Sequence, residues 1–228
     1  MTCGAVIPAA GRARRFGNAD KTVIEIAGKP LLTWTIEALI AADALSEIVI
    51  VDNEDNQQAI AEIIAGIDAP IPVSATRGGA ARMDSVRAGV DALTPECALV
   101  LIHDAARPLV TPELVRSSIA AADLLGAVIS ATPVTDTIKC VDGDLVSETV
   151  DRNLLVSVQT PQVFRREWLL NAYQQWPSDR EATDEASILE SAGYDVRTIP
   201  GAPENLKVTT AIDAIVAEAL LSNRDAVS

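Results

Sequence analysis

Four basic side chains lie close together among small residues near the start of the chain. They follow the apolar run GAVIP and are Arg12, Arg14, Arg15 and Lys21. Such a segment suits a polyphosphate, because backbone N–H groups and several cations can bind separate phosphate oxygens. Neither the Walker pattern GxxxxGK(S/T) nor the dinucleotide pattern GxGxxG is present. The segment is therefore predicted to bind a polyphosphate, and the alternative interpretation is a solvated basic loop.

A carboxylate follows a second apolar run, ALVLI, in the sequence HDAARP. Ligands of open parallel sheets bind beyond the carboxyl ends of the strands, so we expect Asp104 at the same edge as the basic loop. Mg²⁺ is usually bound by one or two carboxylates together with phosphate oxygens. Asp104 is therefore the predicted metal ligand, and the alternatives are an N-cap or an ion pair with Arg107. His103 is interpreted as a packing residue, since no nucleophile partner is evident.

The composition argues against several classes of protein. Thirty-two acidic and 18 basic residues give a net charge of −14, which argues against a nucleic-acid or anionic-membrane binder. Three separated cysteines and one histidine argue against a disulfide framework or a zinc site and favour a reducing cytoplasm. No apolar run reaches the roughly 18 residues of a membrane span, and no secretory signal is recognisable. A cytoplasmic location is expected.

Apolar runs that suit strands alternate with helical patterns along the chain. Short, β-branched runs typical of strands covered on both faces lie at 4–8, 47–51, 71–74, 98–102 and 127–131. Helical spacing lies at 30–42, 56–65, 83–93, 112–125, 166–175, 183–192 and 210–221, and a further strand is expected near 194–199. The alternation predicts an α/β fold with a Rossmann-like, mostly parallel sheet flanked by helices, in a single domain spanning 1–228.

A β-hairpin is predicted where this alternation stops. Residues 137–141 and 145–150 suit two antiparallel strands, and Asp142-Gly143-Asp144 suits the turn between them. An isolated hairpin is only marginally stable, so it must pack on something. The residues alone leave two interpretations, an extension of the edge of the sheet and an arm that packs on a second subunit.

Several motifs, taken in order, carry a resemblance to a known family. They are VIPAAG with Arg15 and Lys21, GGAARMDSV (78–86), HDAARP (103–108), DTIK (136–139), VDRN (150–153), QTPQVF (159–164), TDEAS (183–187) and NLKVT (205–209). Over nearly the whole chain they resemble the 2-C-methyl-D-erythritol 4-phosphate cytidylyltransferases of the non-mevalonate isoprenoid pathway. Sugar nucleotidyltransferases in general share VIPAAG, whereas HDAARP, TPQ and KVT in this order are more specific.

The resemblance implies a reaction. The enzyme would transfer CMP from CTP to 2-C-methyl-D-erythritol 4-phosphate with Mg²⁺, giving 4-diphosphocytidyl-2-C-methyl-D-erythritol and pyrophosphate. The attacking phosphate has a second pKa near ~6, so it needs no general base, and catalysis depends on positioning and cations. One alternative is a cytidylyltransferase for ribitol 5-phosphate or another sugar or polyol phosphate. A nucleotide-binding regulatory module without catalysis is another.

The resemblance also implies roles for individual residues. The implied catalytic cations are Arg15, Lys21 and Lys207. The implied nucleotide-binding residues are Ala10, Gly11, Gly79, Ser85, Asp104 and Ala105, and Asp104 also binds the metal. Thr137, Arg152 and Thr160 would bind the acceptor, and Arg107 would support the loop that contains Asp104 and Ala105. In the family an arm, here 134–158, crosses to a partner subunit, where Arg152 acts on the partner's active site. A homodimer is therefore expected.

The chain departs from the family pattern in its nucleotide loops. Asp20 stands where a proline commonly precedes the loop lysine, and Ala80-Ala81 stand where an acidic pair is frequent. Neither change removes a catalytic group, but Asp20 could pair with a loop cation and alter nucleotide affinity.

Several of these residues also have a purely structural interpretation. Lys207 could cap the end of a strand, and Thr160-Pro161 could form a turn. Arg152 could pair with Asp151 or Glu148. For Asp184-Glu185 the structural interpretation, an acidic helix start, is favoured.

Overall fold

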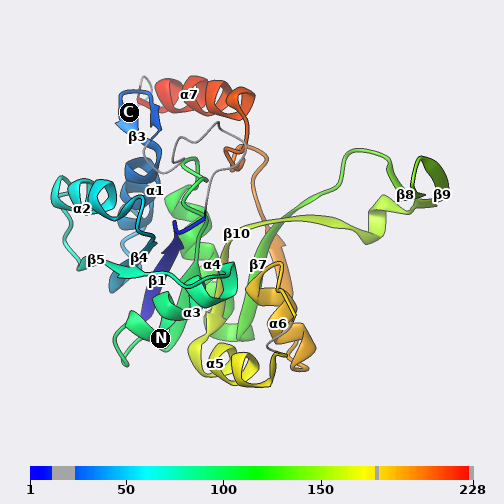
Figure 1. Ribbon diagram of the computed structural model, residues 1–228, viewed down its shortest axis with the longest axis horizontal. Coiled ribbons are helices and arrows are strands. Elements are labelled where there is room, and N and C mark those ends of the chain that lie inside the picture. The colour runs from blue at the N-terminus through cyan, green and yellow to red at the C-terminus, as the bar shows by residue number, and fades with distance from the viewer. Residues whose placement is uncertain (12–23, 178–179, 226–228) are drawn as a thin grey trace.

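A computed structural model describes residues 1–11, 24–177 and 180–225 and shows a central seven-stranded sheet flanked by helices (Figure 1). The strands in spatial order are β11 (Arg197–Pro200), β7 (Ala127–Pro133), β10 (Val156–Arg165), β6 (Leu99–Ile102), β1 (Cys3–Pro8), β4 (Glu47–Asp52) and β5 (Val73–Arg77). The pairs β1–β4, β1–β6, β4–β5 and β7–β11 are parallel. The predicted fold class, mostly parallel and Rossmann-like, is confirmed.

Helices cover both faces of the sheet. One face carries α1 (Leu31–Ile40), α2 (Gln57–Ala65) and α4 (Pro112–Leu125), and the other carries α3 (Arg82–Ala92), α5 (Arg166–Gln175) and α6 (Glu185–Ser191). Alternate residues of β1 point to opposite faces of the sheet. Ala5 and Ile7 therefore pack in the core under α1, α2 and α4, and Val6 packs in the core under α3, α5 and α6. A third cluster joins α7 (Ala211–Asp225) to β2 (Glu25–Ile26), which pairs with β3 (Lys29–Pro30).

The predicted elements match the observed ones to within a few residues. The predicted start of α4 is confirmed, because the Thr111 hydroxyl accepts a hydrogen bond from the Leu114 N–H and Pro112 occupies the first turn. All three cysteines are free. None of the described helices has both the length and the apolar character that a membrane span needs.

The sequence patterns did not predict β10, a ten-residue strand in the interior of the sheet. It runs antiparallel to both β6 and β7, and its register on β7 shifts between Val158 and Gln162. Pro161 lies in this interval, and proline inside a strand is normally found at bulges or edges. The polar residues around Pro161 hid the strand from a search for apolar runs.

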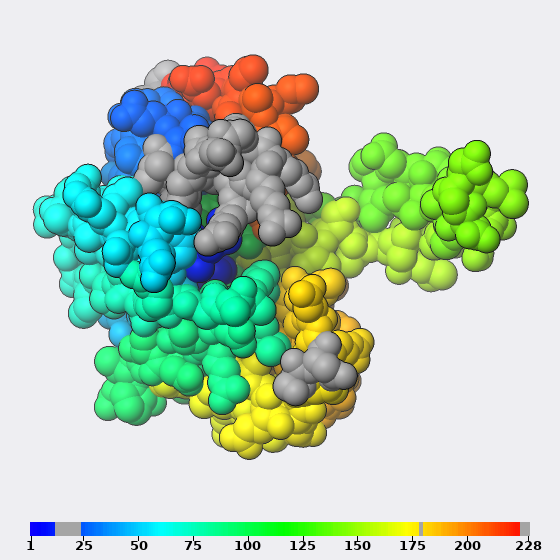
Figure 2. Space-filling view, viewed as in Figure 1, coloured from blue at the N-terminus to red at the C-terminus, as the bar shows by residue number. Residues whose placement is uncertain are grey.

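The hairpin is present and projects away from the sheet. Its strands are β8 (Ile138–Asp142) and β9 (Leu145–Val150), followed by the 3₁₀ turn Arg152–Leu154. Figure 1 and Figure 2 show this arm extending to one side of the body, with only its base near the sheet. Val141, Leu145 and Val146 are more than half exposed on the arm. The interpretation as an extension of the sheet edge is therefore wrong, because β8 and β9 form a separate two-stranded sheet.

Close packing of α3 on the sheet depends on Gly89. A Cβ at this position would lie 2.4 Å from Val6 Cγ1 and 2.8 Å from Val51 Cγ2. Both valines are buried and stiff about χ1. We therefore expect Gly89→Ala to lower the free energy of unfolding by about 1–3 kcal/mol, despite the better helix propensity of alanine. Urea denaturation measures the change.

Gly66→Ala is the matched control, because a Cβ there would make only ordinary contacts of 3.6 Å with two carbonyl oxygens. Its free energy of unfolding should stay the same or rise slightly. Equal stability of the Gly89 variant and the wild type would contradict the packing argument.

Candidate active site

A cavity of about 870 Å³ opens at the carboxyl ends of β1, β4 and β6. Figure 2 shows a hollow at this place, with the dark blue start of the chain visible at its floor. Its walls come from the segment after β1, the turn after β4, the loop before α3, the loop after β6 and Lys207. These are the loops at which open parallel sheets bind ligands.

Most of the predicted nucleotide-site residues lie in this cavity. Its lining includes Ala10, Gly11, Gly79, Ser85, Asp104, Ala105 and Lys207. Arg107 and Thr160 lie beneath it, 9% and 4% exposed. Thr137 and Arg152 lie at the ends of the arm and do not line it. Arg15 and Lys21, with Arg12, Arg14 and Asp20, lie outside the described residues.

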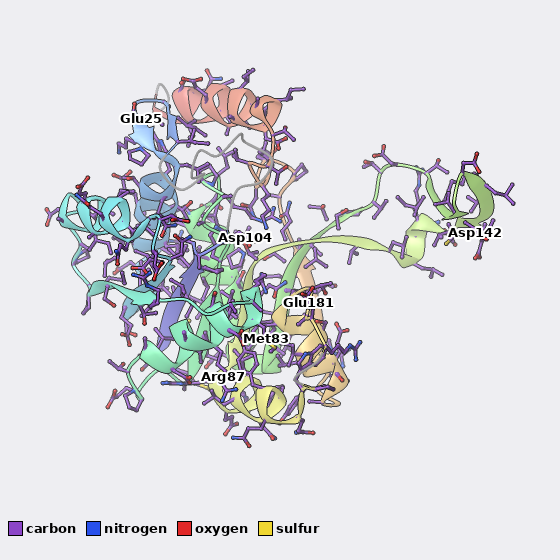
Figure 3. The ribbon with its side chains drawn as sticks, viewed as in Figure 1. Glu25, Met83, Arg87, Asp104, Asp142 and Glu181 are labelled. Carbon is purple, nitrogen blue, oxygen red and sulfur yellow. The ribbon has the colours of Figure 1, made fainter. Side chains whose placement is uncertain are left out.

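Asp104 is bound by two cations. Its Oδ2 accepts from Lys207 Nζ at 3.0 Å and from Arg107 Nε at 3.2 Å. Burial alone would raise the pKa of Asp104, but the charges of Lys207 and Arg107 lower it below its usual range. Asp104 is therefore an anion at neutral pH, and Figure 3 places it near the middle of the molecule. The alternative interpretation, an ion pair with Arg107, is observed, and Asp104 also lines the cavity, where its role as a metal ligand stays a prediction.

The donor set fits a magnesium ion that is held partly by substrate. Both ion pairs of Asp104 use Oδ2, so Oδ1 is the oxygen that can turn to a ligand in the cavity. Among the described residues no cluster of three or more metal-binding side chains exists. A single carboxylate needs phosphate oxygens and waters to complete an octahedral shell, which is the usual arrangement for Mg²⁺ in nucleotide enzymes.

Thr160 and His103 hold the backbone of Asp104. The Thr160 hydroxyl accepts from the Asp104 N–H at 3.0 Å and lies 3.0 Å from His103 Nδ1. His103 Nε2 lies 3.2 Å from the Arg107 carbonyl oxygen, which can only accept, so Nε2 carries the proton. In the neutral ring Nδ1 then accepts from the Thr160 hydroxyl. His103 is thus a packing residue, as predicted, and the acceptor contact of Thr160 stays a prediction.

Three bonds place Lys207 beside Asp104. Arg107 Nη1 donates to the Asn205 carbonyl at 2.8 Å, and the Val208 N–H donates to the Ala106 carbonyl at 2.8 Å. The side-chain amide of Asn205, itself 1% exposed, donates to the Thr160 carbonyl at 2.8 Å. The loop before α7 is therefore attached to both the loop after β6 and to β10, which brings Lys207 into the cavity.

An ion pair at the start of α3 was not predicted. Arg82 lines the cavity, and its Nη1 lies 2.9 Å and 3.0 Å from the two carboxylate oxygens of Glu185, which is fully buried. Burial raises the pKa of Glu185, although the charge of Arg82 acts in the opposite direction. The adjacent Asp184 accepts from the Ser187 N–H as an N-cap. The structural interpretation of Asp184 is confirmed.

The turn after β4 also lines the cavity and escaped prediction. It contributes Asn53, Glu54 and Asp55, and Arg77 follows from the neighbouring strand. The rule that ligands bind at the carboxyl ends of strands applies to this turn as it does to Asp104. That rule could have predicted this turn as part of the site from the sequence alone.

Arg152 makes neither of the two ion pairs that the sequence suggested. Its Nη1 donates to the Thr135 carbonyl, across the base of the arm, and the ion pairs recorded for the described residues do not involve Asp151 or Glu148.

The burial of His103 predicts a pH dependence of stability. Burial lowers the pKa of His103 from 6.5 to about 4, so between these values the unfolded chain binds a proton that the folded chain does not. Stability should therefore fall as the pH falls through this window, by up to about 3 kcal/mol. His103→Asn cannot take up this proton. Urea denaturation between pH 4.5 and 7.5 in EDTA should show a smaller loss for the variant, and parallel pH profiles would contradict the assignment.

Comparisons with known proteins show the family of this chain. The model of the family "2-C-methyl-D-erythritol 4-phosphate cytidylyltransferase" matches residues 3–223. A protein of that name from Alkaliphilus oremlandii is 40% identical over 96% of this chain and 94% of its own length. Another from Dehalococcoides mccartyi is 40% identical over 96% of this chain and 95% of its own length.

Solved structures give the same result. The crystal structure of 4-diphosphocytidyl-2C-methyl-D-erythritol synthase from Anaerococcus prevotii has a TM-score of 0.86 at 31% identity, covering 97% of this chain and 98% of that one. The cytidylyltransferase from Thermus thermophilus has a TM-score of 0.79 at 30% identity, covering 97% and 100%. The chain is therefore a nucleotidyltransferase and belongs to the 2-C-methyl-D-erythritol 4-phosphate cytidylyltransferase family.

Proposed function

We propose that this enzyme transfers CMP from CTP to 2-C-methyl-D-erythritol 4-phosphate, with Mg²⁺, and releases pyrophosphate. The observation that carries the proposal is the cavity itself, in which the Asp104–Lys207 pair faces the segment after β1 and the loop before α3. The proposed reacting groups are all phosphates, which suits a cavity that presents backbone N–H groups and ion-paired side chains.

The nucleotide lies, in this proposal, between the segment after β1 and the start of α3. The peptide N–H groups of Ala10 and Gly11 bind the triphosphate, and Gly79 and Ser85 bind the cytosine end. A Cβ at Gly79 would lie 2.4 Å from Asp84 Cβ, so a side chain there would disturb the loop that faces the base. Ser85 is buried, and its hydroxyl donates to the Ala81 carbonyl at 3.0 Å, which holds that loop on α3.

The chemistry requires charge stabilisation rather than a general base. The attacking phosphate is already ionised at neutral pH, and the single histidine is fully buried beneath the site. Lys207 binds phosphate charge from its ion pair with Asp104, and Arg15 and Lys21 are the proposed cations of the first loop. A bound Mg²⁺ would neutralise phosphate charge next to Asp104. Cations fixed in place before the reaction stabilise the transition state without reorganisation.

The acceptor site is proposed to include Thr137 and Arg152 of a partner subunit. Both belong to the arm segment, 134–158, and neither lines the cavity of its own chain. The arm exposes apolar side chains, and a two-stranded ribbon of this kind needs another surface for its stability. A homodimer joined through the arms would satisfy both requirements.

A panel of acceptor phosphates tests the proposed reaction. With CTP and Mg²⁺, pyrophosphate release should be fastest with 2-C-methyl-D-erythritol 4-phosphate, and kcat/KM for ribitol 5-phosphate should be at least about tenfold lower. A preference for ribitol 5-phosphate would assign the chain to the related cytidylyltransferases. Tight CTP binding without pyrophosphate release from any acceptor would point to a regulatory module instead.

Mixing two inactive variants tests the shared site. Arg152→Ala removes the proposed acceptor contact, and Lys207→Ala removes a cation of the cavity. If Arg152 acts in the partner's cavity, refolding the two variants together should restore about a quarter of wild-type activity, because half of the random dimers contain one intact site. No recovery from the mixture, although each variant is folded, would place Arg152 in its own chain's site. Full activity of Arg152→Ala by itself would place Arg152 outside the reaction.

A further inference from the structure

Two asparagines in the turn between β4 and α2 reach across to the segment after β1. Asn53 Nδ2 donates to the Ala10 carbonyl oxygen at 3.0 Å, and Asn56 Nδ2 donates to the Ala9 carbonyl oxygen at 2.9 Å. Asn56 is 1% exposed, and Asn53 lines the cavity. Two consecutive peptide groups of the proposed phosphate-binding segment are thus held by side chains from a distant part of the sequence.

The same asparagines also bind each other's backbone. The Asn53 N–H donates to Asn56 Oδ1 at 2.8 Å, and the Asn56 N–H donates to Asn53 Oδ1 at 3.1 Å. Asn53 Oδ1 accepts a second bond from the Asp55 N–H at 2.7 Å. Each amide oxygen therefore meets N–H donors and each amide NH₂ meets a carbonyl, which leaves one consistent orientation for both side chains. The turn is a rigid support.

The bonds to the two carbonyls determine where the neighbouring N–H groups point. In a trans peptide the C=O and the following N–H point in opposite directions. With the Ala9 and Ala10 carbonyls held toward the turn, the N–H groups of Ala10 and Gly11 are directed away from it. Ala10 and Gly11 line the cavity, and the Ala9 N–H is itself bound to the Val51 carbonyl at 2.9 Å, which fixes the start of the segment.

We propose that Asn53 and Asn56 are positioning residues for the nucleotide, which hold the Ala10 and Gly11 N–H groups ready for the triphosphate before it binds. This inference rests on the proposed function of the cavity. Neither asparagine carries charge, so their contribution is the orientation of peptide dipoles. A segment that is already ordered does not lose conformational freedom on binding, so the asparagines raise the affinity for phosphates.

Asn53→Asp and Asn56→Asp are the informative variants. Aspartate keeps the oxygen that the turn requires but replaces the NH₂ donor with an oxygen, which repels the Ala10 or Ala9 carbonyl. Asn53→Ala removes this donor and also the two bonds that Asn53 Oδ1 accepts within the turn, without adding charge. Its comparison with Asn53→Asp separates the loss of the side-chain bonds from the effect of the added charge. Gln58→Ala is the matched control, because this exposed amide lies on α2 and, among the described residues, its hydrogen bond stays within the helix, to Glu62.

Titration calorimetry with CTP, inorganic triphosphate and cytidine tests the proposal, together with the acceptor KM and the unfolding midpoint. For Asn53→Ala and both aspartate variants we expect the Kd of CTP and of inorganic triphosphate to rise about tenfold, equivalent to about 1.4 kcal/mol. The Kd of cytidine and the acceptor KM should stay within about twofold of wild type, since neither depends on the triphosphate contacts. The Gln58 variant should match wild type throughout.

Two results would overturn the inference. An unchanged Kd of triphosphate in Asn53→Ala, with the chain folded, would show that the asparagines do not prepare the segment. An equal loss of cytidine and triphosphate affinity would show a general disturbance of the cavity. A failure of the proposed function would be seen separately, as a wild-type chain that binds CTP but releases pyrophosphate with none of the acceptor phosphates. In that case the titrations with triphosphate would still decide the role of the asparagines.

Discussion

The carboxylate of Asp104 carries a negative charge at a place with little access to water, and this constraint determines much of the surrounding structure. An ion in such a place must be paired and hydrogen-bonded. Arg107 and Lys207 supply the charges, and Thr160 binds the Asp104 N–H. These partners come from the loop after β6, from β10 and from the loop before α7. The need to stabilise one anion therefore explains why segments far apart in the sequence meet at the floor of the cavity.

The sequence predicted those parts of the fold whose signal is local. The runs around Val6, Val49 and Leu101 are apolar because both faces of their strands are covered, and they were recognised for that reason. β10 escaped because Gln159, Thr160 and Gln162 make a central strand polar. These side chains are buried with partners: Gln159 donates to the Ala202 carbonyl and Gln162 to Asp184. A polar residue with a distant partner carries no local periodicity, so hydropathy could not reveal it.

The distinction between local signals and distant partners also separates the site residues that were predicted from those that were not. Asp104 and Lys207 were recognisable through motifs and through their places after a strand and before a helix. Arg82 with Glu185, and Asn53 with Ala10, join residues 103 and 43 positions apart. Such pairs exist only after the chain has folded. The motifs identified the groups proposed to touch substrate. The groups that hold those residues in place could be recognised only from the folded structure.

The antiparallel direction of β10 has a mechanical consequence. Its first residues, Val156–Val158, leave the arm, and the strand then enters the centre of the sheet beside β6. Thr160 is only two residues beyond Val158, on the same strand. A displacement of the arm that is transmitted along β10 would move the Thr160 hydroxyl, which binds the Asp104 N–H. The arm and the geometry of the charged centre are thus joined by a short length of a single strand, without an intervening loop.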